Sequence, residues 1–467
     1  MTPFPSMVSF GPGEQLGETR QRDKLLASFA DRITVNADLT RSLVSWQSNK
    51  TTPGFRWFKY KEGFSARLIR YLLEFVPKEG CLLDPFAGTG VAPLVASGEG
   101  LKSVGIEILP VGVHIANGML AAATVNREKF RSDAAALMDS VVAGETGSCH
   151  DPDRFPHIRI TEKAFSLENE SAIAAARAHL RDALPGPETR LMTLAAMSAL
   201  EDASWTSKDG QYLRWDHRSG RSLKAKMEKR CVLPYSESLR AKLDMMDADL
   251  PALSATYDAG AVRMIESSCY DALPQLPNNS VDVVITSPPY ANRYDYTRTY
   301  ALELAWLGYD NAGISQLRQR LLSATVENHS KRGSLSSSYD DALILFDRHP
   351  AIAEITHELE SANRRSELPN PNVIRLVRNY FMELTVVITE LARICRSGAA
   401  VFMVNDNVQY HGEEVPVDLI LSDLAEQCGF RTKAIWALPR GKGNASQQMG
   451  RFGRKELRKC VYWWERR

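Results

Sequence analysis

Residues 81–90, Cys-Leu-Leu-Asp-Pro-Phe-Ala-Gly-Thr-Gly, constrain the fold of this chain more than any other stretch. The short apolar run predicts a strand that ends at Asp84, and a helix is expected from about Val91. Gly88 and Gly90 allow a tight turn between them and let a ligand approach the backbone closely. A strand, a glycine turn and a helix in this order are typical of α/β folds that bind nucleotides.

A second short strand is predicted over residues 104–107, and it ends in another acid, Glu107. An acid in this place can accept hydrogen bonds from both hydroxyls of a ribose, while Asp84 can hold a charged amino-acid group of the same ligand. The turn lacks the Gly-Lys-Ser/Thr of a phosphate-binding loop, which argues against ATP. The alternative is an ordinary strand-to-helix turn followed by a surface acid.

A third segment, Thr-Ser-Pro-Pro-Tyr at residues 286–290, follows the apolar run 281–285. It places a hydroxyl, a rigid corner and an aromatic ring at the end of a predicted strand. The hydroxyl and a carbonyl fixed by the prolines can hold the exocyclic amine of a nucleobase, and the ring can stack on a base that has left its helix. The alternative is a strand that ends in a proline turn with a packing tyrosine. The candidate catalytic residues are Ser287, Pro288, Pro289 and Tyr290.

Together, residues 84–90 and 286–290 resemble the cofactor and catalytic motifs of the S-adenosylmethionine-dependent DNA amino-methyltransferases, which methylate cytosine N4 or adenine N6. Serine rather than aspartate at position 287 is most similar to the cytosine-N4 branch. The resemblance implies a class I methyltransferase fold, which is Rossmann-like with a doubly wound, mostly parallel sheet. It also implies S-adenosylmethionine as the cofactor and a flipped target base in duplex DNA.

The resemblance extends to two further segments that bear on the cofactor. Residues 268–273 are similar to the segment whose acid reads the adenine end of the cofactor, here Asp271. Residues 55–64 are similar to the segment that closes over methionine, and residues 373–436 to the later strands and helices of the domain. The cofactor-binding residues implied by the resemblance are Asp84, Phe86, Gly88, Gly90, Glu107, Asp271 and Phe58.

Long stretches separate the matching segments, and they predict the domain organisation. We expect an N-terminal extension over residues 1–50, a catalytic domain over 51–123, 262–309 and 371–467, a mainly helical inserted subdomain over 124–261 and a second insertion over 310–370. The first insertion is the expected DNA-recognition subdomain. In one group of these enzymes, the recognition domain lies between the cofactor-binding and catalytic halves. The insertion here comes earlier, before Asp271, so the sequence does not identify the segment that reads DNA.

Local secondary structure is predicted from apolar spacing and stop signals. Helices are expected over residues 172–184, 191–203 and 373–395, and Ser397-Gly398 is the expected stop signal of the last one. A closing pair of strands is expected over 432–438 and 459–464.

Basic residues interleaved with aromatic ones predict contacts to DNA in three places. Residues 205–230 hold eight lysines and arginines among tryptophan and tyrosine, and Arg221 and Lys224 are the candidates there. Residues 292–298 add Arg293 and Arg298, which either meet phosphates or take part in helix capping and packing. The glycine-rich stretch 439–454 adds Lys442, and its alternative is a disordered hairpin tip.

Three reactions fit these motifs. Methylation of cytosine N4 in DNA is favoured, methylation of adenine N6 uses the same geometry, and methylation of an RNA base amine is the third. The first fifty residues look too short for the RNA-binding module that the RNA enzymes carry. No metal is expected, because the sulfonium of the cofactor is itself the electrophile, and no Pro-Cys pair is present for attack on cytosine C5.

Composition bounds the partners and the compartment. The formal net charge of the 467-residue chain is +1, so any contact to DNA must come from local patches. Seven cysteines without a Cys-x-x-Cys pair, no secretory signal and no apolar run near about 20 residues predict a soluble, cytoplasmic, prokaryotic protein with reduced thiols. The expected partners are duplex DNA and possibly a cognate restriction endonuclease, while the oligomeric state is left open.

Overall fold

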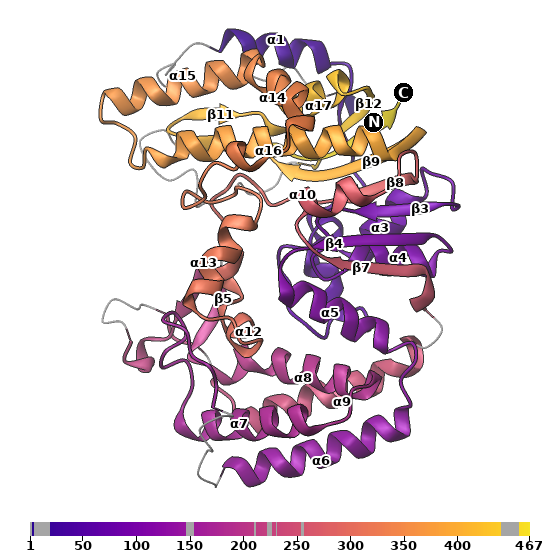
Figure 1. Cartoon of the computed structure of the whole chain (residues 1–467), viewed down its shortest axis with the longest axis vertical. Coiled ribbons are helices and arrows are strands. Elements are labelled where there is room, and N and C mark those ends of the chain that lie inside the picture. The colour runs from indigo at the N-terminus through magenta and orange to yellow at the C-terminus, as the bar shows by residue number, and fades with distance from the viewer. Residues whose placement is uncertain are drawn as a thin grey trace.

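A computed structural model describes residues 2–3, 19–145, 154–209, 212–221, 227–229, 231–253, 256–439 and 457–467 of the chain (Figure 1). In this part of the chain a single large sheet holds nine strands in the order β1-β2-β12-β13-β9-β8-β3-β4-β7. Their bounds are β1 Thr2–Pro3, β2 Ile33–Val35, β3 Cys81–Asp84, β4 Lys102–Glu107, β7 Val262–Glu266, β8 Val281–Thr286, β9 Cys395–Asp406, β12 Phe430–Ala437 and β13 Lys459–Arg466.

The central strands of the sheet are parallel, and the chain leaves β3 in both directions. β4 and then β7 pair in parallel on one side of β3, while β8 and then β9 pair in parallel on the other. β13 is antiparallel to both of its neighbours, β9 and β12. The order therefore reverses between β3 and β8, and in open α/β sheets ligands bind outside the carboxyl ends of the strands at such a switch point.

Both faces of the sheet are covered, because neighbouring strand residues belong to different hydrophobic clusters. Leu82 and Val283 pack with the helices α3 (Ala66–Leu73), α4 (Val91–Gly98) and α5 (Pro110–Ala121). The next residues along these strands, Leu83 and Val284, pack with α16 (Asn372–Ile394) and α17 (Val417–Gln427). Alternation of side chains across a strand gives each face its own core. The expected doubly wound, mostly parallel α/β fold of the class I methyltransferases is confirmed.

The segment predicted as an inserted subdomain is mainly helical where the structure describes it. It holds α6 (Arg127–Glu145), α7 (Leu167–Asp182), α8 (Pro187–Ala203), α9 (Tyr235–Leu253) and the two-stranded sheet of β5 (Thr206–Asp209) and β6 (Tyr212–Trp215). α7 and α8 confirm the helices predicted over 172–184 and 191–203.

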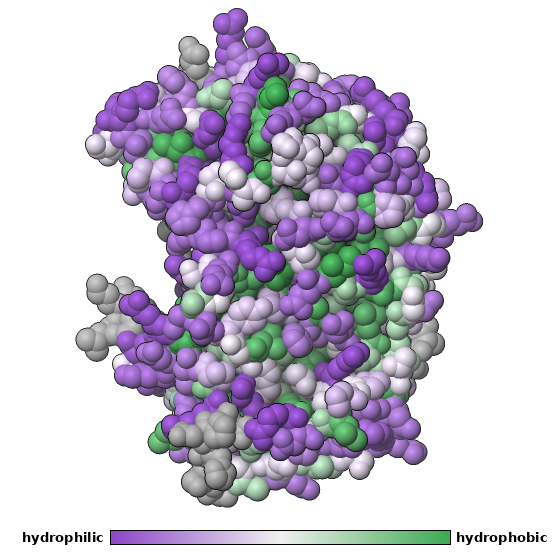
Figure 2. Space-filling view, viewed as in Figure 1, coloured by the Kyte–Doolittle hydropathy of each residue, from purple (hydrophilic) through white to green (hydrophobic). Residues whose placement is uncertain are grey.

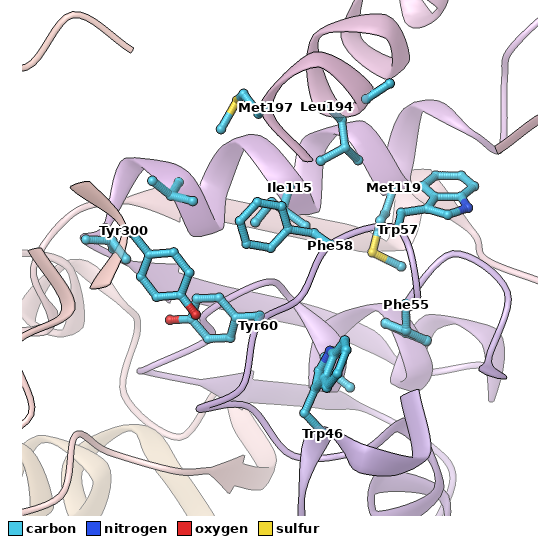
Figure 3. Close-up of a cluster of buried hydrophobic side chains, with 14 of the residues drawn as sticks. Trp46, Phe55, Trp57, Phe58, Tyr60, Ile115, Met119, Leu194, Met197 and Tyr300 are labelled. Atoms are coloured by element: carbon cyan, nitrogen blue, oxygen red, sulfur yellow. The ribbon is translucent and has the colours of Figure 1, made fainter. Parts of the chain in front are cut away.

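One apolar cluster continues from the catalytic sheet into these helices. Figure 3 shows Phe58 in one buried cluster with Ile115 and Met119 of α5 and with Leu194 and Met197 of α8. A Cβ on Gly118 would lie 2.8 Å from the Leu194 side chain, so α5 and α8 pack closely there. The inserted helices thus share a core with one face of the sheet.

Three further helices, α1 (Arg20–Phe29), α14 (Asp340–Asp347) and α15 (Pro350–Arg364), cover the opposite face of the sheet. α1 and α15 pack together, and α14 packs on α16. The shorter elements are α2 (Arg41–Val44), α10 (Cys269–Ala272), α11 (Tyr296–Thr299), α12 (Ala301–Trp306), α13 (Asn311–Arg320), β10 (Val408–Tyr410) and β11 (Glu413–Val415).

Two details of secondary structure bear on the sequence-based expectations. α16 spans Asn372–Ile394, which confirms the helix predicted over 373–395 to within one residue, and β9 begins at Cys395, so Ser397 and Gly398 lie in the strand. β12 and β13 confirm the predicted closing pair of strands.

Figure 2 shows the molecule from the same side as Figure 1. The surface seen there is mostly hydrophilic and is interrupted by smaller apolar patches. Among the described residues, no helix combines the length and apolar character that crossing a membrane requires.

Candidate active site

The glycine turn and the double-proline corner line one pocket at the carboxyl ends of the parallel strands. Its volume is about 770 Å³, including space that opens to solvent. Its wall contains Gly88 and Glu107 from the first motif and Ser287 and Pro289 from the second. Two stretches about 200 residues apart in the sequence therefore face the same space.

Asp84 and Thr286 join the two motifs directly. β3 and β8 are parallel neighbours, and the Thr286 hydroxyl donates to Asp84 Oδ1 over 2.6 Å at their carboxyl ends. The backbone N–H of Phe86 donates to the same oxygen over 3.0 Å. Asp84 is fully buried, its Oδ2 has no hydrogen-bond partner, and burial raises its pKa to about 7 despite the two donors.

Glu107 holds the glycine turn from the next strand. Its two carboxylate oxygens each accept a backbone N–H over 2.6 Å, one from Gly88 and the other from Leu109. Burial raises the pKa of Glu107 to about 7, and the nearby charge of Asp84 adds to the rise. Gly88 has a φ of +53°, a conformation that side chains with a Cβ rarely adopt, so glycine is required there.

Gly90 takes part in packing rather than in the pocket wall. It caps α4 with a φ of +77°, and a Cβ on it would lie 3.0 Å from the Ala116 side chain in α5. Phe86, another predicted cofactor residue, does line the pocket.

The catalytic motif presents its serine to the pocket. The Ser287 hydroxyl donates to the Tyr290 hydroxyl over 3.3 Å, which leaves the lone pairs of Ser287 Oγ able to accept. Pro288 is buried, and Tyr290 is half-buried next to the pocket without being part of its wall. Burial raises the pKa of Tyr290 well above its ordinary value, so its hydroxyl remains protonated.

Besides Gly90, three predicted cofactor residues are absent from the pocket wall: Asp84, which is fully buried behind the turn, Asp271 and Phe58. The Asp271 carboxylate is exposed and accepts from the Ser268 hydroxyl over 2.7 Å, and it is Ser268 that lines the pocket. Phe58 is buried in the core shared with the inserted helices, where its ring lies 6.1 Å from that of Tyr300. The side chains that segment 55–64 does bring to the pocket wall are Tyr60, Glu62 and Phe64.

Sequence reasoning missed these three residues although they belong to a segment that it had singled out. The tyrosine and the glutamate resembled ordinary surface positions, because no local pattern tells which residues of an irregular segment face a pocket. It also missed Arg320, Leu321 and Leu322, which carry the second insertion to the pocket wall.

Buried Glu383 in α16 ties the second insertion to this wall. It accepts from the Ser323 hydroxyl over 2.5 Å and from the Tyr270 hydroxyl over 2.9 Å, and Tyr270 lines the pocket. Lys331 Nζ lies 2.9 Å from both oxygens of Glu383. The serine-rich stretch around Lys331 is therefore anchored at one end to the core helix.

The predicted DNA-contacting residues differ in their surroundings. Arg293 is exposed directly after the catalytic motif. Arg298 is ion-paired with Asp295 at 3.2 Å and with Glu327 at 2.9 Å, and Asp295 caps α11, so the capping alternative accounts for it. Arg221 donates to the backbone oxygens of residues 159 and 162 and lies over the Trp215 ring at 4.4 Å. Lys224 and Lys442 lie outside the described residues.

Two more lysines of the basic stretch 205–230 turn inward. Lys208 is 2% exposed and forms an ion pair with Glu303. Lys229 Nζ donates to several backbone oxygens, among them those of Ser204 at 2.9 Å and Thr206 at 3.2 Å. Lys208 thus joins β5 to α12, and Lys229 joins the segment after β6 to the end of α8 and the start of β5.

The residues of the pocket suit a cofactor that combines a nucleoside with a cation. Asp84 and Glu107 have no ion-pair partner among the described residues, and an orphaned carboxylate oxygen is buried beside a turn that only glycine can form. A positive group would favour the ionised form of both acids and lower their raised pKa values. Tyr60, Phe86, Tyr270 and Tyr296 add flat aromatic surface to the wall.

The fold and the pocket together define a class I methyltransferase, and comparison with known proteins narrows the class. No family model matches the chain. It is 39% identical over 447 residues to the type II methyltransferase M.AvaI of Nostoc sp. and to that of Anabaena variabilis, matching 94% of this chain and 92% of each relative. It is 37% identical over 476 residues to the type II methyltransferase M.BsoBI of Geobacillus stearothermophilus, with 96% and 92% covered.

The chain belongs to the type II methyltransferases. The expected membership in the DNA methyltransferases is thereby confirmed at the level of the family. The cytosine-N4 branch and the roles of individual residues stay predictions.

Proposed function

We propose that this chain is a site-specific DNA methyltransferase that transfers the methyl group of S-adenosylmethionine to N4 of a cytosine flipped out of duplex DNA. One observation carries the proposal: Ser287 and Pro289 share a pocket with the turn of Gly88, and the Asp84–Thr286 hydrogen bond fixes the two motifs against each other. The names of the relatives support a methyltransferase of the type II class.

The chemistry assigned to the motif follows from the target. The lone pair of an exocyclic amine is delocalised into the base, so the enzyme must localise it and direct it at the methyl group. Ser287 Oγ and the carbonyl of Pro288 accept from the amine, and Tyr290 stacks on the base. S-adenosylmethionine supplies the electrophilic methyl group, while positioning and fixed dipoles of the chain lower the barrier. A type II context also makes an endonuclease with the same recognition sequence the expected partner.

The test is methyl transfer from labelled S-adenosylmethionine to duplex DNA, followed by digestion to nucleosides and identification by mass. N4-methylcytosine is the expected product. Ser287→Ala is expected to lower kcat by about a hundredfold, because it removes one acceptor for the amine.

Its matched control is Ser336→Ala, which changes an exposed serine in the second insertion. N6-methyladenine as the product would replace the cytosine assignment by the adenine alternative. Methylated RNA with unmodified DNA would favour the RNA alternative, and cofactor binding without transfer to any nucleic acid would contradict the enzyme.

A further inference from the structure

Glu62 is an acid in the pocket wall that neither motif includes. It lies in segment 55–64, between the short helix at Trp46–Thr51 and α3, and it lines the pocket together with Tyr60 and Phe64. It is half-buried, so its carboxylate is reachable from the pocket. Its environment determines what it can bind.

Two neutral hydroxyl groups hold the carboxylate in place. Tyr294 donates to Glu62 Oε1 and Tyr300 donates to Glu62 Oε2. Burial, and then the charge of Glu62, raises the pKa of both tyrosines well above the ordinary value, so both remain protonated donors. Each carboxylate oxygen has two lone pairs, and one on each stays available.

The tyrosines orient Glu62 without neutralising it. Within the described residues, no lysine, arginine or histidine forms an ion pair with its carboxylate. Lys208 interacts with the charge of Glu62 from a distance, but Lys208 is committed to the ion pair with Glu303. The negative charge of Glu62 is therefore directed at whatever occupies the pocket.

The segment that carries Glu62 is fixed by the inserted helices. Asp249 of α9 accepts from the backbone N–H of Gly54 over 3.1 Å, from Arg56 and from the Trp57 indole over 2.8 Å. Lys59 forms an ion pair with Glu201 of α8 at 2.7 Å. Lys61 donates to the backbone oxygen of Lys208. With both sides held, the carboxylate is preorganised and loses little freedom when a ligand binds.

We propose that Glu62 is a cofactor-binding residue that receives the α-ammonium of the amino-acid part of the cofactor. The inference rests on the proposed function, because it takes S-adenosylmethionine as the ligand. An ammonium group brings N–H donors to the free lone pairs of Glu62, which gives charge-assisted hydrogen bonds. The sulfonium has no hydrogen to donate, and the target amine is uncharged.

Binding of three ligands, which needs no turnover, distinguishes a role of Glu62 at the ammonium from a role at the sulfonium. S-adenosylmethionine carries the ammonium and the sulfonium, S-adenosylhomocysteine keeps only the ammonium, and 5′-methylthioadenosine has neither. By calorimetry, Glu62→Gln is expected to lower the affinity for the first two ligands by about tenfold or more and to change the affinity for the third by no more than about twofold. Glu79→Gln, an exposed acid before the amino end of β3, is the matched control and should change none of them.

Other outcomes overturn the assignment. Weaker binding of S-adenosylmethionine alone would assign Glu62 to the sulfonium. Equally weakened binding of all three ligands would show a general effect on the pocket. Unchanged binding with a raised KM for DNA would place Glu62 at the base. If Glu62→Gln does not fold, Glu62→Asp keeps the charge but withdraws it, and the same pattern is expected. Failure of the wild-type protein to bind S-adenosylmethionine would contradict the proposed function instead.

Discussion

At the scale of single residues, Asp84 and Glu107 are held in a state that suits a cation. Both acids are buried, and both have a pKa raised to about 7 by burial. The folded protein therefore keeps protons on these carboxyl groups at pH values where the unfolded chain has released them. A cationic cofactor removes that penalty, because it favours the charged forms.

The direction of these pKa shifts predicts how the stability of the cofactor-free protein changes with pH. Asp84 has an ordinary pKa of 3.8 and a folded pKa of about 7, so the native state binds more protons across this window. The free energy of unfolding then falls as the pH rises from about 4 to about 7. In Asp84→Asn this contribution is absent, while Glu107 is present in both proteins. Relative to the variant, the wild type is expected to lose about 1–3 kcal/mol between pH 5 and pH 8.

Urea unfolding at several pH values without cofactor measures this difference. A gap between the two proteins that does not change with pH would contradict the raised pKa. With saturating S-adenosylmethionine, the fall in stability with rising pH is expected to be smaller for the wild type.

At the scale of elements, β5 supports the pocket from a distance. Lys208 of β5 is buried against Glu303 of α12, and its Nζ lies 4.5 Å from the centre of the Phe58 ring and 4.9 Å from that of Tyr300. Tyr300 holds Glu62, so a strand of the inserted segment is joined to the pocket wall through two side chains. The basic stretch that suggested contacts to DNA thus has a structural role at this residue.

Breaking the buried Lys208–Glu303 ion pair should lower the free energy of unfolding far more than breaking an exposed ion pair. Lys208→Met leaves Glu303 buried and unpaired, which is expected to destabilise the protein by about 3–5 kcal/mol in urea unfolding. Lys242→Met removes a partly exposed partner of Asp202 at 3.0 Å and is expected to cost under about 1 kcal/mol. The double change Lys208→Met with Glu303→Leu should recover most of the loss. Equal effects of the two single changes would contradict the buried pair.

At the scale of the whole molecule, the net charge of +1 gives no general attraction to DNA. Affinity must come from cations that the fold leaves free near the pocket. Arg221 and Arg298 are engaged with protein groups through hydrogen bonds and ion pairs. Arg293 lies three residues after Tyr290 and is exposed, with its guanidinium 6.0 Å from the centre of the Tyr410 ring.

Arg293→Ala is therefore expected to weaken duplex DNA binding and to reduce the slope of log K against log salt by about 1. Cofactor affinity should stay unchanged. Arg67→Ala, which removes an exposed arginine from α3, is the control and should leave both quantities unaltered. Fluorescence anisotropy over a salt titration makes the measurement, and an unchanged slope for Arg293→Ala would remove this residue from the interface.

Much of the fold and the centre of the site could be predicted because their signals are local. Asp84, Gly88 and Glu107 sit at ends of short apolar strands, where spacing alone indicates a parallel sheet, and parallel strands bring their carboxyl ends to one edge. Ser287 follows another such strand, so its presence in the same pocket follows from the same rule.

The rest depended on contacts between distant segments. Glu62 faces the pocket because Tyr294 and Tyr300 hold it there, and nothing within residues 55–64 contains that information. Asp271 turns to solvent while Ser268 takes the pocket, although both lie in one predicted segment. Lys208 reads as a surface cation until burial beside Glu303 is known. The sequence by itself determined which strands carry the chemistry, since strand ends are local features; only the tertiary structure decided which charges face the ligand, because burial and pairing join residues far apart in the chain.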